Sequence, residues 1–212
     1  MNKNDPPHDS PGDAGQTPPE RPQHISARVP EGVSRGVFST GMIVMTSGNE
    51  FILDFIQNLG QPPQIAARVV MPHATMPQFI EALRKNLEIY SKQFGQPPEL
   101  PRGNKQVRQP TIQELYDEIK LSDDVLSGSY ANGVMIGHSV SDFKFDFLTN
   151  LYPTTAVSCR VYLSTPQVPR MLESLVGTFE QFQKRLQEQQ RLREEGQEPN
   201  EPPPTEPDSD NA

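Results

Sequence analysis

The chain contains two copies of one segment, and this internal repeat constrains its fold more than any other feature. Residues 41–94 align without a gap with residues 133–186, at an offset of 92 positions, and 14 of the 54 aligned pairs are identical. The identical pairs include aromatic, acidic and basic residues: Phe51/Phe143, Asp54/Asp146 and Arg68/Arg160. Chance similarity would not keep its register over several structural elements, so both copies should have the same fold.

The pattern within each copy predicts three strands followed by one helix. Phe51, Leu53 and Phe55 alternate with the residues of the opposite face, as in a strand with one buried face. Apolar residues at three- and four-residue steps then predict an amphipathic helix. The expected strands cover 36–46, 51–56 and 65–71 in the first copy and 130–138, 143–147 and 157–163 in the second, and the helices cover 76–94 and 168–186.

One helix can cover only one face of a three-stranded sheet, and a unit of about 60 residues is marginally stable alone. We therefore predict an α+β fold of two βββα repeats, each an antiparallel three-stranded sheet with one amphipathic helix, packed as an intramolecular pseudo-dimer. The units could join their sheets edge to edge or exchange their helices across a pseudo-twofold axis. The predicted boundaries are 28–96 for the first repeat, 97–125 for a linker with a short helix at about 112–121, and 126–194 for the second repeat with its extended helix.

The two ends of the chain differ in composition from the repeats. Residues 1–27 and 195–212 are rich in proline and polar residues, which predicts a disordered arm and a disordered acidic tail. Residues 1–27 and 188–212 together carry the whole net charge of −8, so the central part is electrically balanced. Because phosphate contacts require basic side chains, this balance argues against a strongly basic nucleic-acid surface.

The first copy resembles an uncharacterised prokaryotic family of short domains with the signature E-F-x-L-D-F, then A-R-V-V-M, then L-x-x-N-L-x-x-Y. The signature is present here as residues 50–55, residues 67–71 and the helix positions Leu83, Asn86, Leu87 and Tyr90. The second copy resembles it less well, with departures that include Asp142, Phe145, Thr178 and Phe182. The resemblance implies a fold and a bacterial context but no activity, and the departures imply that the second copy keeps mainly the packing role.

Asp54 and Arg68, repeated as Asp146 and Arg160, are the candidate site residues. Alternation places all four on the face opposite the aromatic residues, on strands expected to be neighbours. The interpretation we favour is a cross-strand ion pair that stabilises each sheet by a few tenths to about 1 kcal/mol. The second interpretation is a charged centre that recognises a partner. Catalysis ranks last, because it requires a nucleophile or a tuned acid and base converging in a pocket.

No other pattern in the sequence indicates chemistry. The four histidines, His8, His24, His73 and His138, lack the spacing of a metal site, and Cys159 lies on the inward face of a strand, where an inert buried thiol is expected. A nucleophile elbow, a phosphate-binding loop and a dinucleotide-binding glycine motif are all missing. We predict no catalytic residues, no cofactor and no metal, and hence a protein that is not an enzyme.

The duplicated core, with one sheet face per unit still to be covered, predicts a protein-binding or assembly module. Its partner would be an unidentified protein or a second copy of the chain. The alternative is single-stranded nucleic-acid binding by a tandem sheet-and-helix fold similar in outline to PUR and whirly proteins, although few aromatic residues are expected on the exposed strand faces. Because no apolar run approaches the roughly 18 residues of a membrane helix and there is one cysteine, we expect a cytoplasmic protein without membrane contact. That the protein is bacterial is what the family resemblance implies.

Overall fold

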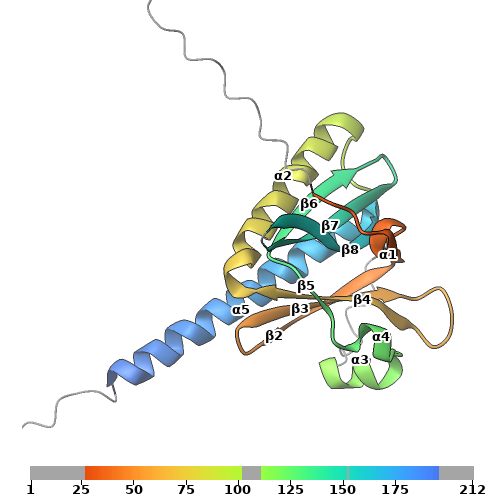
Figure 1. Cartoon of the computed structure of the whole chain (residues 1–212). Helices are drawn as coiled ribbons and strands as arrows, with labels where there is room; N and C mark the ends of the chain where they lie inside the picture. Colours follow the sequence, from red (N-terminus) through yellow and green to blue (C-terminus); the bar gives the residue numbers. More distant parts are fainter. Residues whose placement is uncertain (1–26, 102–110, 152, 196–212) are drawn as a thin grey trace, which may run out of the picture.

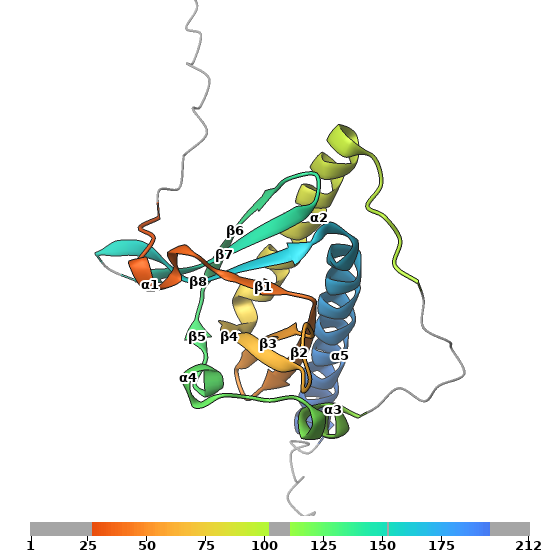
Figure 2. The ribbon, with the colours of Figure 1, turned by 90° about the vertical axis from the view of Figure 1, so that its right-hand side faces the viewer.

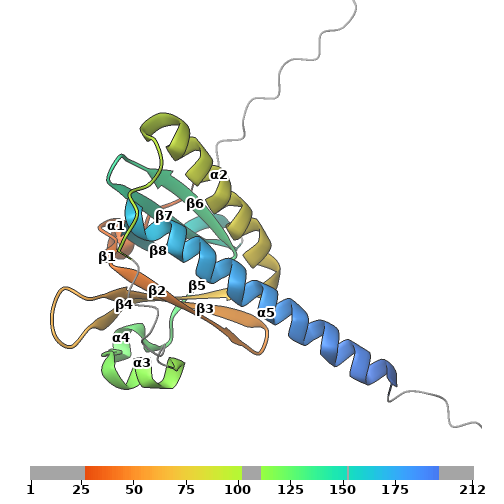
Figure 3. The ribbon, with the colours of Figure 1, turned by 180° about the vertical axis from the view of Figure 1, so that it is seen from behind.

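The computed structural model describes residues 27–101, 111–151 and 153–195, which form an α+β fold of two sheets and two long helices (Figure 1). Nearly all of the two tails that the sequence predicts to be disordered lies outside these described residues. Seen from behind, the two long helices lie on the same side of both sheets (Figure 3). Within the described ranges, none of the helices combines the length and apolar character needed to cross a membrane.

The first repeat supplies three antiparallel strands, β2 (Gly41–Ser47), β3 (Glu50–Gln57) and β4 (Gln64–Pro72). A short 3₁₀ turn, η1 (His73–Thr75), leads into the long helix α2 (Met76–Phe94). The alternating residues of β3 divide as the sequence predicts, because its phenylalanines are fully buried in the core. A proline occupies the first turn of α2, where its missing N–H is tolerated.

The second repeat has the same order of elements. Its strands are β6 (Gly133–His138), β7 (Asp142–Leu151) and β8 (Thr154–Ser164), again antiparallel. The turn η2 (Thr165–Gln167) leads into α5 (Val168–Glu195), which continues beyond the end that corresponds to α2. The chain therefore consists of two tandem domains, each with a sheet and a helix.

Each sheet has four strands, so the prediction of three-stranded sheets was wrong. The stretches predicted as single long strands, 36–46 and 130–138, each divide into two. β1 (Val37–Ser39) separates from β2 at Thr40, and β5 (Ser129–Tyr130) separates from β6. The division has a local cause, because the Thr40 amide donates to the Ile56 carbonyl and the chain turns there instead of extending. The first sheet has the order β2-β3-β4-β5, and the second has the order β6-β7-β8-β1.

The two added strands are exchanged between the repeats. β1 leads into the first repeat but pairs in parallel with β8 of the second sheet, with Val37 opposite Val161. β5 leads into the second repeat but pairs in parallel with β4 of the first sheet, with Ser129 opposite Val69. Both pairings join equivalent positions, since each residue of one pair lies 92 positions from its counterpart in the other. Figure 2 shows the chain crossing from one sheet to the other after β1, towards β2, and crossing back after β5, towards β6.

The long helices also lie against the opposite repeat. The ring of Phe51 on β3 contacts Phe182 of α5, with centroids 5.4 Å apart. The equivalent contact joins Phe143 on β7 to Tyr90 of α2, at 5.5 Å. The inner face of each sheet is therefore covered by a helix from the other repeat.

One hydrophobic cluster includes residues of both repeats. At its centre, Phe55 and Phe147 occupy equivalent positions and contact each other, with ring centroids 5.5 Å apart. Phe79 of α2 packs edge-on against the same Phe147. Because the repeats share their buried side chains, neither domain has a separate core.

In the described part of the chain there are three short helices besides the two long ones. They are α1 (Glu31–Ser34), α3 (Ile112–Glu118) and α4 (Asp123–Leu126). α3 begins with the capping box expected from the sequence, in which Thr111 and Glu114 bind each other's backbone amides. α3 and α4 belong to the segment predicted as a linker. They lie near the face of the first sheet that points away from α5 (Figure 1). We call this face, and its counterpart on the second sheet, the outer face.

Candidate functional site

Asp54 and Arg68 form a bidentate ion pair on the outer face of the first sheet. The Arg68 guanidinium donates from Nε to Asp54 Oδ1 at 2.8 Å and from Nη2 to Oδ2 at 2.7 Å. The hydroxyl of Tyr116 in α3 donates to the same carboxylate. The third guanidinium nitrogen, Nη1, donates to the Leu126 carbonyl at the end of α4, at 3.1 Å. The pair thus ties two strands to the segment that leads into the other repeat.

Asp146 and Arg160 repeat this arrangement on the second sheet. Arg160 donates to the two carboxylate oxygens of Asp146 at 2.5 and 2.9 Å. Its Nη1 donates to the Ser34 carbonyl at the end of α1, at 2.9 Å. The third partner differs, because Lys144 Nζ, 3.3 Å from Asp146 Oδ2, replaces the tyrosine hydroxyl. Each arginine therefore anchors the last residue of the short helix that precedes the opposite repeat.

Both carboxylates are buried, whereas the sequence interpretation treated them as part of an ordinary exposed sheet face. The exposed fraction is 0% for Asp54 and 2% for Asp146. The reason is tertiary, because short helices distant in the sequence contact this part of each outer face. α3 and α4 of the predicted linker contact the first sheet, and α1 of the first repeat contacts the second sheet. The hydrogen bonds that the Arg68 guanidinium donates to Asp54 raise the pKa of the guanidinium, and burial raises the pKa of the Tyr116 hydroxyl. Arg68 therefore stays charged and Tyr116 stays protonated, as donors to one carboxylate.

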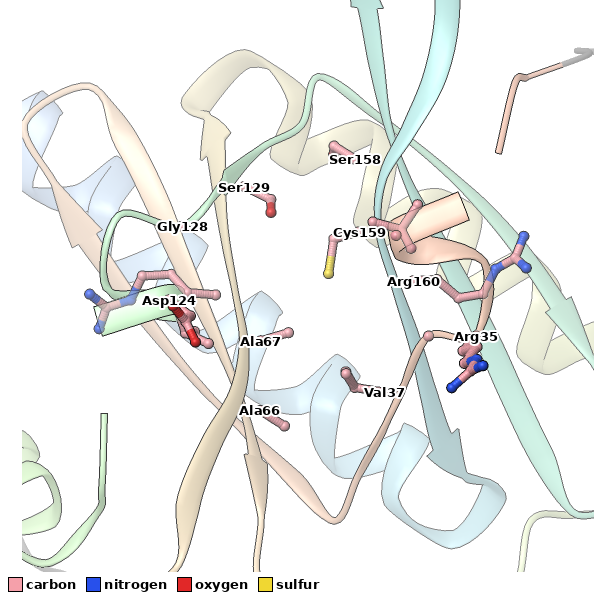
Figure 4. A pocket seen from close by; sticks show the side chains of 15 residues that line it. Arg35, Val37, Ala66, Ala67, Asp124, Gly128, Ser129, Ser158, Cys159 and Arg160 are labelled. Atoms are coloured by element: carbon pink, nitrogen blue, oxygen red, sulfur yellow. The ribbon is translucent and has the colours of Figure 1, made fainter. Parts of the chain in front are cut away.

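A cavity of about 330 Å³ lies between the two repeats, with β4 on one side and β8 on the other. The side chains of Val37, Ala67, Ser129 and Cys159 point into it, while the guanidinium of Arg160 points away (Figure 4). Its lining comes largely from equivalent positions of the two repeats, which places it where the repeats meet. Two of the arginines in its lining, Arg68 and Arg160, are already paired with Asp54 and Asp146.

Cys159 contributes the sulfur atom of that cavity. Its residue is 8% exposed, and burial raises the pKa of the thiol to about 11. The sulfur is therefore protonated at neutral pH and a poor nucleophile. The expectation of a buried, inert thiol agrees with this position.

The outer faces carry different side chains at equivalent positions. On the first sheet, one row across the four strands is apolar or aromatic: Met45, Ile52, Val70 and Tyr130. On the second sheet, the corresponding row is Gly137, Lys144, Tyr162 and Phe38. Tyr130 is 44% exposed and Phe38 is 41% exposed, and the remaining side chains of the rows are partly exposed. Both faces therefore present side chains to solvent beside their buried ion pairs.

A family model for a protein of unknown function, DUF3467, matches the chain twice, at residues 4–97 and 101–189. The chain belongs to the DUF3467 family. The two matches confirm the predicted resemblance to tandem copies of an uncharacterised domain. No curated protein and no solved structure matches the chain.

Each DUF3467 repeat has one described histidine, and the two lie at different places in the fold. His73 lies in η1 against Phe51 and Phe182, and His138 lies at the end of β6 against Tyr90. Among the residues that the structure describes, none forms a hydrogen bond with His73 Nε2 or His138 Nδ1. Within the described ranges, no three histidine, cysteine or acidic side chains gather as a metal site would require. His8 and His24 lie outside the described residues.

Sequence reasoning missed Phe38 and Tyr130 as surface residues of this DUF3467 chain. Both were included in long strands of their own repeats, and their exposure was not foreseen. The glycines two positions earlier, Gly36 and Gly128, were the sequence signal that could have indicated a change of chain direction before each strand. Both have a positive φ, 66° and 72°, where the chain leaves the preceding short helix to join the other repeat's sheet.

Proposed function

We propose that the chain is a non-enzymatic protein-binding module, built as an intramolecular pseudo-dimer, whose partner docks on the outer face of the first sheet. The observation that carries the proposal is the uncharged row of Met45, Ile52, Val70 and Tyr130. Partly exposed apolar side chains gathered on one face are typical of protein interaction sites. Tyr130, the most exposed member, is of a residue type enriched at interfaces.

Reciprocal contacts support the pseudo-dimer. Strand pairing, helix packing and arginine anchoring each occur twice, at positions related by the 92-residue offset. Isolated bridges at the sheet edges follow the same rule, since Arg28 pairs with Ala156 and Lys120 pairs with Gln64. A pseudo-dimer of this kind provides a rigid base from which its two outer faces can diverge.

The partner we propose is an amphipathic helix of another protein. The helix α3 already lies against the outer face of the first sheet, where its Tyr116 hydroxyl donates a hydrogen bond to Asp54. A second helix could lie beside α3 over the apolar row. Four strands about 4.8 Å apart give a row about 14 Å long, which corresponds to about 10 residues of helix. Such a helix would place an apolar stripe on the row and its polar side in solvent.

The polar groups of the chain support a role without catalysis. The carboxylates of Asp54 and Asp146 are engaged by arginines, and the arginines also bind backbone carbonyls. The Cys159 thiol, with a pKa of about 11, is a poor nucleophile at neutral pH. A single buried thiol also suits the reducing bacterial cytoplasm in which we place the protein.

The test uses site-specific photo-crosslinking with a benzophenone amino acid at position 52 of the full chain. Position 144, the equivalent on the second sheet, provides the matched control. In lysate, position 52 should crosslink to a partner peptide that is helical with an apolar stripe. A synthetic amphipathic helix with leucines at positions i, i+3, i+4 and i+7 serves as a defined probe. Its affinity should fall at least about tenfold in Ile52→Lys, because about 1.4 kcal/mol or more is lost when a charge is desolvated.

Ile52→Lys is a conservative test of the surface, since the second repeat already has Lys144 at the same position of the same fold. Lys144→Ala should leave peptide affinity unchanged. Equal crosslinking from positions 52 and 144 would contradict the proposal. Crosslinks from position 52 to a second copy of the chain, or to a partner without a helical segment, would also contradict it.

A further inference from the structure

The outer face of the second sheet is less apolar than its counterpart on the first sheet. Where the first sheet has Ile52 and Val70, the second has Lys144 and Tyr162. We infer that this face binds single-stranded nucleic acid, with an unpaired base stacked on the rings of Phe38 and Tyr162 and with Lys144 contacting the adjacent phosphate. The inference does not depend on the helix-binding proposal, because the two sites lie on different sheets.

The aromatic pair exists only because of the strand exchange. β1 brings Phe38 into register with Tyr162 on β8, and Tyr162 is in register with Lys144 on β7. Directly opposite side chains on one face lie about 5 Å apart, so the three form a continuous row. Gly137 on β6 ends the row without a side chain. Two rings and a cation in a row, open at one end, provide a platform for stacking.

The position of Phe38 leaves its ring accessible. It lies on the edge strand of the second sheet, and the residue is 41% exposed. When another flat apolar surface covers an aromatic side chain that is exposed to this extent, the free energy of the system falls. A nucleobase offers such a surface, and stacking on exposed rings is tolerant of base identity because every base has a π-face.

The local charge also differs between the two faces. On the second sheet, Asp146 is bound by two cations, Arg160 and Lys144. Asp142 lies on the same face of β7, two positions before Lys144, and balances the second cation. On the first sheet, Asp54 is bound by one cation and by the neutral Tyr116. Lys144 therefore provides a cation beside the exposed rings. The Lys144 side chain is 39% exposed, so its ammonium can contact a phosphate while it remains near Asp146.

This combination fits a nucleic-acid strand better than a protein helix. An apolar helix laid over the row would desolvate Lys144 without providing it with an anionic partner. A single strand alternates flat bases with phosphates, so the same ligand satisfies both the rings and the cation. A duplex would not fit, because its bases are already stacked.

The test measures the fluorescence anisotropy of a labelled oligothymidylate of about 12 nucleotides, titrated with the full chain at about 50 mM salt. We expect binding that weakens at least about tenfold in the double variant Phe38→Ala/Tyr162→Ala, given the usual loss per stacked base. Lys144→Ile introduces the residue that the first sheet has at the equivalent position, Ile52. It should weaken binding and reduce the salt slope by about 0.7, the value for one phosphate contact on a single strand.

Tyr130→Ala is the matched control, because Tyr130 occupies the position of Phe38 in the other repeat. It should leave the affinity unchanged. Photo-crosslinking of an iodouracil-containing strand to the unmodified protein should label Phe38 or Tyr162, and this measurement does not require any variant to fold. The inference is overturned if no oligonucleotide binds at about 100 µM protein. It is also overturned if a duplex competes equally well, or if the crosslinks map elsewhere.

Discussion

Arg68 donates a hydrogen bond of 3.1 Å to the carbonyl oxygen of Leu126, a residue 58 positions further along the chain. The same guanidinium binds both oxygens of Asp54. One side chain thus connects a strand of the first sheet to the end of a helix that leads into the second repeat. Arg160 does the same in the opposite direction, by binding Ser34. We therefore expect the two ion pairs to stabilise the association of the repeats as well as the pairing of strands within each sheet.

Asp54→Asn should destabilise the fold by about 3 kcal/mol, more than expected for an exposed pair. Asp54 is fully buried, and loss of its charge leaves the guanidinium of Arg68 without a counter-ion. Urea unfolding measures the effect. Glu188→Gln, which alters the exposed Arg191–Glu188 contact, is the control and should cost less than about 0.5 kcal/mol. Equal effects for the two variants would contradict the prediction.

Gly128→Ala should destabilise the protein by about 2 kcal/mol or more. Gly128 has a φ of 72°, and an added Cβ would lie 2.9 Å from side-chain atoms of both Arg68 and Val70. Thermal unfolding compares it with Gly177→Ala. An added Cβ at Gly177, in the interior of α5, meets nothing within 4 Å, so that change should stabilise by up to about 1 kcal/mol. A neutral Gly128→Ala would show that the exchanged segment can adjust.

Cutting the chain between residues 101 and 111 should leave the two fragments associated. Each fragment provides an edge strand and a long helix to the sheet of the other. A protease site inserted there and size-exclusion chromatography after cleavage provide the test. Phe147→Ala removes the contact with Phe55 and should lower the denaturant concentration at which the fragments separate. Fragments that separate as folded monomers would disprove the exchange.

The Cys159 thiol should make stability depend on pH in the alkaline range. Burial raises its pKa from 9.0 to about 11, so the folded state holds the proton more tightly than the unfolded chain does. The resulting stabilisation is complete below pH 9 and is lost as the pH rises towards 11, by about 2–3 kcal/mol in total. Cys159→Ala should remove this part of the pH dependence, which unfolding experiments from pH 8 to pH 11 would detect.

Alanine suits this substitution, because Ala67 occupies the equivalent position in the first repeat. In the native protein, the thiol should also react slowly with a disulfide reagent near pH 8 and rapidly after unfolding. Fast reaction of the folded protein would show that the sulfur is more exposed than its position between the sheets implies.

The register of the candidate site could be predicted from the sequence, but its burial could not. Alternation along β3 and β4 placed Asp54 and Arg68 on one face, and the structure pairs them directly. Tyr116 comes from a segment that looked like a linker, because α3 has only seven residues and follows a proline-rich stretch. No periodic pattern shows where such a short helix docks, since its position depends on contacts with a distant sheet.

The division of the predicted strand 36–46 into β1 and β2 could not be predicted from the sequence either. Residues 36–46 have strand-forming residues on both sides of Thr40, so local propensity favours one long strand. The turn becomes visible only in its contacts, where the Thr40 side chain accepts from the Asn58 amide. Asn132 binds the Asn150 amide in the same way, through its side-chain oxygen, although the two residue types differ.

By itself, the sequence determined the duplication, the three strands and one helix of each repeat, and the face of each element that is buried. These features follow from hydrophobic periodicity, which is local and is present twice in this chain. Tertiary structure decided which repeat provides the cover for each sheet. Periodicity specifies that a face must be covered but not by what, and the two helices present similar apolar stripes. The exchange follows from the path of the chain at Thr40 and Asn132, where hydrogen bonds to the neighbouring strand separate β1 and β5 from their own repeats.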